Sequence, residues 1–483
     1  MKREPMIRML TGAAVLALLS ACTVGPDYAR PSDPVPAAFK ESEGWKIAEP
    51  KQAASGAPWW SVYNDPVLDQ LERQIDINNQ NLKLAEASFR QARALLEQAR
   101  AGYFPTVSLD ASGQRAKSGT NSTSSSPGRI RNSFDLSAGA TWDIDVWGRI
   151  RRTVESADAT AQASAADLAS ARLSAQATLA TTYLQLRVND EIKRLLDATT
   201  AAFQRSLDIT QNRYAVGVAA RADIATAQAQ LETTKSQAVG VGVQRAQLEH
   251  AIAVLIGKPP SDFSLPPVEF SMGVPVAPAG VPSTLLERRP DIASAERLMA
   301  SANAEIGVAE SAYYPDVTLS ASFGFASSVI DDLLKMSSRV WSVGAQASET
   351  LFDGGLRGAQ VEAAKAVYDQ RIAAYRQTVL TGFQQVEDNL STLRILEQQA
   401  SVQDGAVQAS LQAEQLTLNQ YQAGTVAYTS VVTAQATALS NRQSALTILQ
   451  NRLLASVTLI QALGGGWDST QLPSGDALRS DAR

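Results

Sequence analysis

The chain has 483 residues, of which 45% are hydrophobic and 19% are charged, and its formal net charge is −5. One cysteine and one histidine exclude a disulfide framework, a cysteine-based zinc site and a His-pair metal motif, and no cofactor is expected. The mild acidity argues against a nucleic-acid partner, because a protein that binds the phosphate backbone presents a basic face.

The first 22 residues are typical of a bacterial lipoprotein signal. Lys2, Arg3 and Arg8 are followed by a short apolar stretch, Met9–Leu19, which is too short for a spanning helix. The stretch ends in Leu-Ser-Ala-Cys, which looks like a lipobox, so cleavage before Cys22 leaves a thiol for lipid attachment. We therefore expect Cys22 to carry lipid, palmitate included, and to anchor the chain in the outer-membrane lipid.

The chain then repeats itself. Asn212–Gly217 is similar to Asn419–Gly424, and Tyr103–Pro105 is similar to Tyr313–Pro315, which indicates two tandem copies of about 200 residues. The expected organisation is a signal peptide (1–21), an extended N-terminal segment (22–60), a first repeat (61–257), a proline-rich connector (258–285), a second repeat (286–466) and a C-terminal tail (467–483).

Each repeat begins with a helical run, at 65–101 and at 288–312. Two strands follow, and then a very long helical run, at 151–214 and at about 359–421, before a second helix of about 38 residues returns. The run 151–214 has no proline or glycine and spans roughly 95 Å if unbroken. Gly382 and Gly405 are expected to loosen the second run locally. On the helices alone, a cytosolic coiled coil remains an alternative.

Residues 134–146 alternate strictly between apolar and polar side chains, which predicts a strand. The same alternation marks 107–112, 317–324 and, less clearly because of Glu349, 340–352. The two hairpins are expected to close at Ser118–Arg129 and near Ser327–Ser338. Apolar-out, polar-in alternation suits an outer-membrane strand, although a soluble sheet that covers a helical core shows it too.

The number of strands separates these two interpretations further. Four strands cannot close a barrel, and an open edge in lipid leaves backbone groups unpaired, so three copies giving twelve strands are expected. The predicted fold is mainly α with a small β part, in which a tandem-repeat protomer contributes four strands to a trimeric 12-stranded β-barrel and long helices to a periplasmic α-helical tunnel. Asp135, Asp143 and Asp145 would then make the barrel lumen acidic and favour cations.

Several short motifs resemble the TolC-type outer-membrane efflux proteins, in their lipoprotein (NodT-like) branch. They are the segment Cys22–Tyr28, the pair Trp59-Trp60, and Leu286-Glu-Arg-Arg-Pro-Asp-Ile292 followed by Ala302–Ala309. The resemblance covers about residues 16–468 and implies a homotrimer that acts as the exit duct of a tripartite pump. It also implies a periplasmic adaptor, an inner-membrane transporter of the resistance-nodulation-division type, export of small molecules such as drugs, and a contribution to multidrug resistance.

The resemblance also points to the ends of the long helices as the adaptor-docking tips. The matching residues are Arg213, Tyr214, Gly217, Tyr421 and Gly424. Each glycine permits the reversal between two antiparallel helices, so a role in the turn alone is the alternative.

Family members close the periplasmic end with acidic residues just after the second tip. The corresponding positions here are Ser430 and Thr433, which cannot ionise, whereas the first-repeat equivalent of Ser430 is Asp223, next to Arg221. We hypothesise that three Asp223 side chains ring the aperture. The alternative is an aspartate placed favourably at a helix start.

An enzyme is not expected, because the chain has no phosphate-binding loop, no G-x-S-x-G and no H-E-x-x-H motif. His250 lies late in a predicted helix, where a packed or capping role is expected. A protein-secretion duct and a non-conducting trimeric surface stalk both remain open as functions, and a conductance measurement separates the stalk from a channel.

Overall fold

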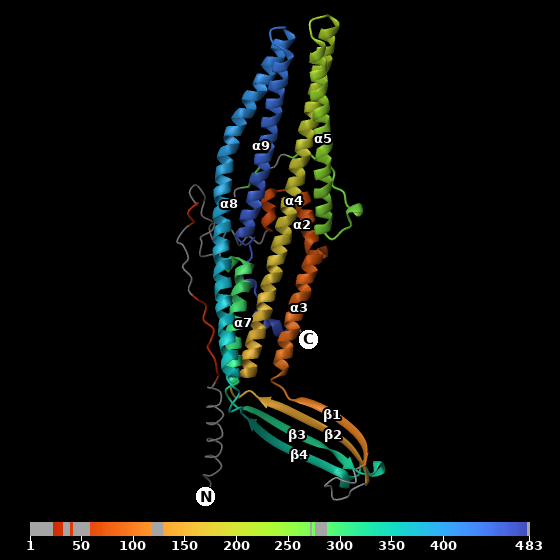
Figure 1. Cartoon of the computed structure of the whole chain (residues 1–483), viewed down its shortest axis with the longest axis vertical. Helices are drawn as coiled ribbons and strands as arrows, with labels where there is room; N and C mark the ends of the chain where they lie inside the picture. The colour runs from red at the N-terminus through yellow and green to blue at the C-terminus, as the bar shows by residue number, and fades with distance from the viewer. Residues whose placement is uncertain are drawn as a thin grey trace.

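The molecule is a long helical body with a small sheet at one end (Figure 1). A computed structural model of the chain describes residues 23–31, 39–41, 58–117, 129–270, 273–275 and 287–480. The predicted signal peptide and Cys22 lie outside these residues. The helical hairpins of the two repeats run side by side, with their tips at the end far from the sheet. The prediction of a mainly α fold with a small β part is confirmed.

The described residues of the first repeat form α2 (Pro66–Asn78), α3 (Gln80–Ala101), α4 (Arg149–Ala215) and α5 (Arg221–Leu255). The prediction of one run over 65–101 is wrong, because the backbone of Asn79 is extended and separates α2 from α3. The Asn79 side chain accepts a hydrogen bond from the Leu82 N–H at 2.9 Å and donates one to the Leu255 carbonyl at 2.7 Å. The same residue therefore caps α3 and ties it to the end of α5.

The second repeat contains α7 (Pro290–Ser311), α8 (Leu356–Gln422) and α9 (Tyr428–Ala462). The long helices α4 and α8 both have 67 residues, about 100 Å, and the return helices α5 and α9 both have 35. α8 runs through Gly382 and Gly405 without interruption.

Several short helical elements lie within the described residues. They include the 3₁₀ turns Trp59–Tyr63, Pro260–Asp262, Ile330–Asp332, Met336–Ser338 and Ser469–Gln471, and α10 (Ala477–Ser480). In the part of the chain that the structure describes, no helix combines the length and apolar character needed to cross a membrane.

The sheet has four antiparallel strands in the order of the sequence, β1 (Thr106–Lys117), β2 (Ile130–Ile144), β3 (Asp316–Ser327) and β4 (Arg339–Ser348). β4 ends at Ser348, so Glu349 lies outside the strand and no longer disturbs its alternation. β2 ends at Ile144, so the prediction that Asp145 and Val146 continue it is wrong.

The strand register places apolar side chains on one face of the sheet and polar ones on the other. Val107 pairs with Ala140 and Leu109 with Ala138, whereas the alternate pair Asp110 and Ser137 lies on the opposite face. Every residue of β1 and β4 is exposed, and the sheet extends away from the helices (Figure 1). The sheet therefore does not cover the helical core, which removes the interpretation as a soluble covering sheet.

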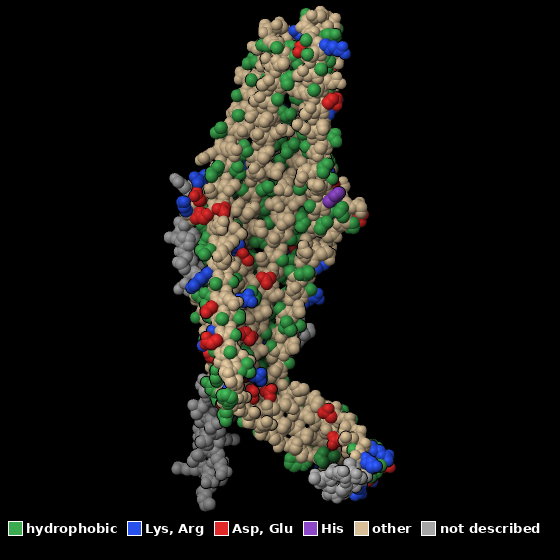
Figure 2. Space-filling view, viewed as in Figure 1, with side chains coloured by type: hydrophobic (Ala, Val, Ile, Leu, Met, Phe, Trp, Pro, Cys, Tyr) green, Lys and Arg blue, Asp and Glu red, His purple; other side chains and the backbone are tan. Residues whose placement is uncertain are grey.

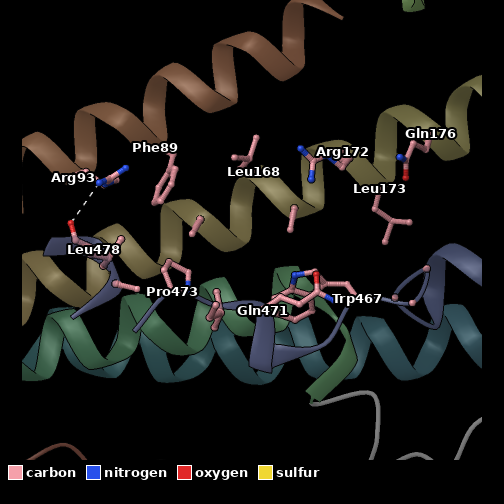
Figure 3. A pocket seen from close by; sticks show the side chains of 17 residues that line it. Phe89, Arg93, Leu168, Arg172, Leu173, Gln176, Trp467, Gln471, Pro473 and Leu478 are labelled. Carbon is pink, nitrogen blue, oxygen red and sulfur yellow. Dashed lines mark hydrogen bonds between the residues drawn. The ribbon is translucent and has the colours of Figure 1, made fainter. Parts of the chain in front are cut away.

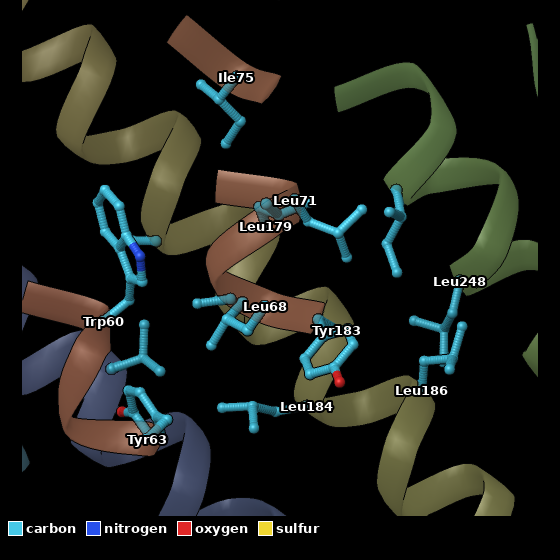
Figure 4. Packing of buried hydrophobic residues seen from close by; sticks show 14 of the residues in the cluster. Trp60, Tyr63, Leu68, Leu71, Ile75, Leu179, Tyr183, Leu184, Leu186 and Leu248 are labelled. Atoms are coloured by element: carbon cyan, nitrogen blue, oxygen red, sulfur yellow. The ribbon is translucent and has the colours of Figure 1, made fainter. Parts of the chain in front are cut away.

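The largest cluster of buried apolar side chains joins α2 to the middle of α4 and the end of α5 (Figure 4). Leu68, Leu71 and Ile75 of α2 project from one face of that helix, at the spacing of an amphipathic helix. They pack with Leu179 and Tyr183 of α4. This packing holds the short helix α2 against the long helix of its repeat.

Two glycines at equivalent positions of the repeats allow each return helix to end in close contact with the backbone at the first helices of its own repeat. Gly257 and Gly464 follow α5 and α9 in the left-handed conformation, with φ of 70° and 94°. A Cβ atom would lie 2.3 Å from the Asn78 carbonyl oxygen at Gly257 and 1.9 Å from the Arg288 carbonyl oxygen at Gly464. Both positions need glycine for the close approach as well as for the backbone angle.

One carboxyl group lies inside this core. Glu72 of α2 is fully buried, and neither of its side-chain oxygens has a hydrogen-bond partner among the described residues. Burial, reinforced by the nearby Asp76 carboxylate, raises the pKa of Glu72 to about 9. The side chain is therefore a neutral acid at pH 7 in the folded protein.

This neutral acid predicts a stability that falls as the pH rises. The folded state keeps a proton that the unfolded chain releases above its ordinary pKa of 4.5, so the free energy of unfolding falls as the pH rises from about 4.5 to about 9. Glu72→Met is expected to raise the apparent melting temperature in detergent at pH 8. The difference in melting temperature between the variant and the parent is expected to become smaller towards pH 5. Glu232→Met, at an exposed position of α5, is the control. Parallel pH profiles of the Glu72 variant and its parent would contradict a buried neutral acid.

Candidate functional site

Both helical tips reverse the chain in the same way. Gly217 and Gly424 are left-handed, with φ of 77° and 79°. The N–H of the residue after each glycine donates back into the helix, from Val218 to the Arg213 carbonyl at 2.9 Å and from Thr425 to the Gln420 carbonyl at 3.0 Å. These are helix C-terminal glycine motifs, and they account for the Tyr-x-x-Gly repeat seen in the sequence.

The two tips are joined through Arg213. Its Nη1 donates to the Gln422 carbonyl of the second tip at 2.8 Å, and its guanidinium carbon lies 4.7 Å from the ring centroid of Tyr421. Tyr421 is buried, and its ring centroid lies 5.2 Å from that of Tyr428. Burial, with Tyr421 and Asp223 nearby, raises the pKa of Tyr428 to about 12. Arg213 and Tyr421 therefore connect one hairpin to the other.

The other predicted tip residues lie on the surface. Tyr214 is 45% exposed, and Gly217 and Gly424 are exposed at the reversals themselves. Of the five predicted docking residues, these three are exposed, Arg213 is half-buried and Tyr421 is buried.

The three aperture candidates lie at the starts of the return helices. Asp223 is in the first turn of α5, and its Oδ2 accepts a hydrogen bond from the Ala220 N–H at 3.3 Å. Ser430 and Thr433 are exposed one turn apart on α9, and the Thr433 hydroxyl donates to the Thr429 carbonyl at 3.0 Å. Asp223 therefore caps the start of α5.

A buried polar network below the tips was missed by sequence reasoning. Gln435 of α9 is 2% exposed, and its amide donates to the Ser206 hydroxyl of α4 at 3.1 Å. Gln230 of α5 donates to the Gln435 side-chain carbonyl at 3.3 Å. The sequence feature that could have indicated this network is Gln435, a glutamine within an otherwise apolar stripe of its helix. This network links both hairpins just inside the tips.

The polar face of the sheet carries two of the three predicted lumen acids. Asp135 and Asp143 belong to β2 and share the face of Ser112 and Thr318, their cross-strand partners. Asp143 accepts a hydrogen bond from the Thr318 hydroxyl at 2.8 Å, and an Arg149 nitrogen lies 3.9 Å from it. Arg149 thus partly offsets the negative charge of Asp143, and no sequence pattern predicts this contact.

Asp145 does not lie on the strand. Its two carboxylate oxygens accept hydrogen bonds from the Ile150 N–H at 2.9 Å and the Arg151 N–H at 2.8 Å, so it caps α4. In the second repeat, Asp353 bonds the N–H groups of Gly355 and Arg357 at the start of α8, although it lies two residues before the N-cap glycine and Asp145 lies three. The prediction that Asp145 lies on the barrel strand with Asp135 and Asp143 is therefore wrong.

The segment that follows Cys22 is fixed to the junction between strands and helices. Arg152 of α4 is almost fully buried, and it donates to the carbonyls of Val24 at 3.1 Å and Gly25 at 3.0 Å and to the Asp27 carboxylate at 2.9 Å. The Val24 N–H donates to the Trp147 carbonyl at 3.1 Å. Residues 24–27, which follow the predicted lipidation site, are therefore held close to the base of the sheet.

An open cavity of about 470 Å³ lies between α3, α4 and the C-terminal segment (Figure 3). Arg93 projects towards this segment and donates to the Leu478 carbonyl at 3.5 Å, while Arg172 pairs with Asp76 at 3.0 Å. Within the described ranges, no group of three or more His, Cys, Asp or Glu side chains could hold a metal ion. His250 is exposed on α5 (Figure 2), so the expectation of a packed or capping role is wrong.

Comparisons with known proteins agree with this architecture. The family model described as outer membrane efflux protein matches residues 71–258 and 281–465. The toluene efflux pump outer membrane protein TtgC of Pseudomonas putida is 29% identical over 466 residues, which is 96% of each chain. The pyoverdine export outer membrane protein OpmQ of Pseudomonas aeruginosa is 29% identical over 464 residues, 94% of this chain and 97% of that one.

Solved structures of outer-membrane channels share the fold over nearly its whole length. The outer-membrane channel OprN superposes with a TM-score of 0.87 at 30% identity and covers 92% of this chain and 100% of its own. The open state of the Neisseria gonorrhoeae channel MtrE gives a TM-score of 0.83 at 28% identity, over 93% and 99% of the two chains. The chain therefore belongs to the outer membrane efflux protein family, and it is an outer-membrane efflux channel of a Gram-negative bacterium with a large periplasmic helical part.

Proposed function

We propose that three copies of this chain form one continuous conduit, a homotrimer whose strands close a barrel of twelve and whose helices form a periplasmic tunnel. The observation that carries this proposal is the pair of open sheet edges. Within the described residues, β1 and β4 each pair on one side only, and the unpaired N–H and C=O groups of an edge are costly in lipid. Pairing β4 of one copy with β1 of the next removes all the edges.

The conduit is passive and serves as the exit duct of a tripartite pump, energised by an inner-membrane transporter of the resistance-nodulation-division type. A periplasmic adaptor docks on the tips, where Tyr214, Gly217 and Gly424 are exposed. The cargo consists of small organic molecules, in keeping with relatives named for toluene efflux and pyoverdine export. Lipid on Cys22 anchors each copy beside the strand–helix junction, in keeping with the bonds that Arg152 makes to Val24 and Gly25.

The wall of the conduit is acidic at two levels. Asp135 and Asp143 repeat three times on the polar face of the barrel, and Asp223 repeats three times at the aperture, with Ser430 and Thr433 as its uncharged neighbours in the ring. Rings of carboxylates attract cations. A cation-selective reversal potential in a salt gradient is therefore the expected electrical property.

Arg213→Ala is expected to raise the single-channel conductance of the acylated trimer severalfold in a planar bilayer. The variant loses both the hydrogen bond to Gln422 and the contact with the Tyr421 ring, so the two hairpins of each copy separate more easily at the tip. Single-channel current recordings of the parent and the variant at one salt concentration give the comparison.

Lys235→Ala is the matched control, because Lys235 is a cation of α5 whose ion pair is with Glu232 of the same helix, at 2.9 Å. Its conductance is expected to equal that of the parent. If neither the parent nor the Arg213 variant conducts although both are trimeric, the molecule is a stalk and the conduit is refuted. A folded monomer would refute the trimer.

A further inference from the structure

Cations lie on the apolar face of the sheet at its outer end. The strand register assigns Arg115 and Lys117 of β1 to the same face as Val107 and Leu109, and Arg339 of β4 to the same face as Phe325, its cross-strand partner. The acids of the strands, Asp110, Asp135, Asp143 and Asp316, all belong to the opposite face. Figure 2 shows Lys and Arg side chains gathered at this free end of the sheet.

These three cations are accessible and unbalanced. Arg115, Lys117 and Arg339 are exposed, and among the described residues none of them has an ion pair or a ring contact. The cations near the base of the sheet differ in this respect, since Arg149 lies 3.9 Å from Asp143 and 3.7 Å from Asp316. The three outer cations are therefore available to bind an anionic group outside the sheet.

The distance from the base of the sheet places them at the outer boundary of a membrane. Arg115 is eight residues beyond Val107, which is about 27 Å along the strand and about 20 Å along the normal at the usual tilt of a barrel strand. At the base, the indole N–H of Trp142 donates to the Tyr103 carbonyl at 3.1 Å, and Trp147 stacks on Tyr314 at 4.8 Å. Aromatic side chains of this kind mark the inner boundary, next to the helices.

The two edges bring the cations together in the proposed trimer. Arg339 lies on β4 and the other two lie on β1, which are the opposite edges of one sheet. Pairing β4 with β1 of the next copy sets the two strands about 4.8 Å apart, so Arg339 and the next copy's Arg115 and Lys117 share one seam on the lipid side. The trimer has three such seams.

We propose that each seam binds the phosphate groups of the glycolipid that forms the outer leaflet of the membrane, so that a phosphorylated glycolipid covers the joint between neighbouring copies. This inference rests on the trimeric conduit proposed above. Guanidinium groups match phosphate oxygens with paired hydrogen bonds, and an ammonium group adds a third charge at the same level. The apolar strip below, with Leu109, Phe323 and Trp341 exposed, suits the acyl chains of the same lipid.

The test measures binding of lipid A with two phosphates to the purified acylated trimer in detergent, by native mass spectrometry. Parent trimer is expected to bind it roughly tenfold to a hundredfold more tightly than lipid A from which both phosphates have been removed. The variant Arg115→Gln/Lys117→Gln/Arg339→Gln is expected to lose this preference. Arg131→Gln is the matched control, because Arg131 pairs with Ala116 at the same level but on the polar face, and it is expected to keep the preference.

The comparison of the two lipids uses the parent protein, so it holds even if the triple variant misfolds. Equal affinity for phosphorylated and dephosphorylated lipid A, or an unchanged preference in a triple variant that is still trimeric, would overturn the inference. Conductance in phospholipid bilayers separates this failure from failure of the conduit. A parent that conducts without preferring the phosphorylated lipid refutes the seam alone, whereas a parent that forms no trimer refutes both.

Discussion

Gly464→Ala is expected to prevent the second repeat from closing against its own first helix, and to cost more stability than Gly466→Ala. An added Cβ would lie 1.9 Å from the Arg288 carbonyl oxygen, which belongs to the backbone just before α7 and cannot rotate away. The left-handed φ of 94° adds strain for any residue with a side chain. We expect a loss of about 3 kcal/mol or more, because strain and collision add.

Gly466→Ala is the control for Gly464→Ala. Gly466 is also left-handed, with φ of 86°, but no atom lies within 4 Å of the position that its Cβ would take. It isolates the backbone strain, which is expected to cost about 1–2 kcal/mol. Thermal melts followed by helical circular dichroism in detergent give both values. Equal losses at the two positions would show that the contact with Arg288 carries no weight.

Arg152→Met is expected to free residues 23–31 from the strand–helix junction. Methionine replaces the aliphatic stem but leaves the carbonyls of Val24 and Gly25 without their donors, at a cost of about 2–4 kcal/mol for two acceptors. The proposed lipid anchor on Cys22 would then no longer be connected to the base of the sheet through a fixed segment. Faster proteolytic cleavage within residues 23–31, with fewer heat-resistant trimers on gels, is the expected readout.

Arg172→Met is the matched variant for Arg152→Met. Arg172 lies on the same helix, but its side chain is 46% exposed and pairs with Asp76 at the surface. It is expected to leave cleavage unchanged, because surface ion pairs contribute little. Unchanged protection of residues 23–31 in Arg152→Met would show that other contacts hold the segment.

Periodicity and repetition were enough to predict most of the architecture. The stripe of apolar residues along 151–214 predicted α4 to within two residues, and the duplicated Asn-x-Tyr-x-x-Gly motif marked both tips. The strand prediction ran too far at Asp145 because alternation alone does not mark where a strand ends. In the second repeat, Asp353 also caps the start of the long helix, but it lies one position closer to the helix than Asp145 does, so aligning the repeats does not by itself mark Asp145 as a cap.

Contacts between distant segments could not be predicted in this way. Arg152 meets Val24 across 128 residues, and Arg213 meets Gln422 across 209, and no local pattern carries that information. Glu72 was missed because it lies beside the apolar stripe of Leu68, Leu71 and Ile75 and is buried only when α2 packs on α4. His250 was misplaced for the opposite reason, since Leu248 and Ile252 face the core and turn it outward.

The two tips share one backbone geometry but differ in their side chains. A partner protein would therefore meet two kinds of binding site at the tips. The first tip supplies the reaching arginine and an acidic helix start, whereas the second supplies the acceptor carbonyl and Ser430. In the proposed trimer, six hairpins alternate between these two kinds of binding site. The ring of tips therefore has threefold symmetry in its side chains, although its backbone is close to sixfold symmetric. A partner made of identical subunits would occupy three binding sites of each kind. Its subunits would bind with two affinities, so a binding titration would be biphasic.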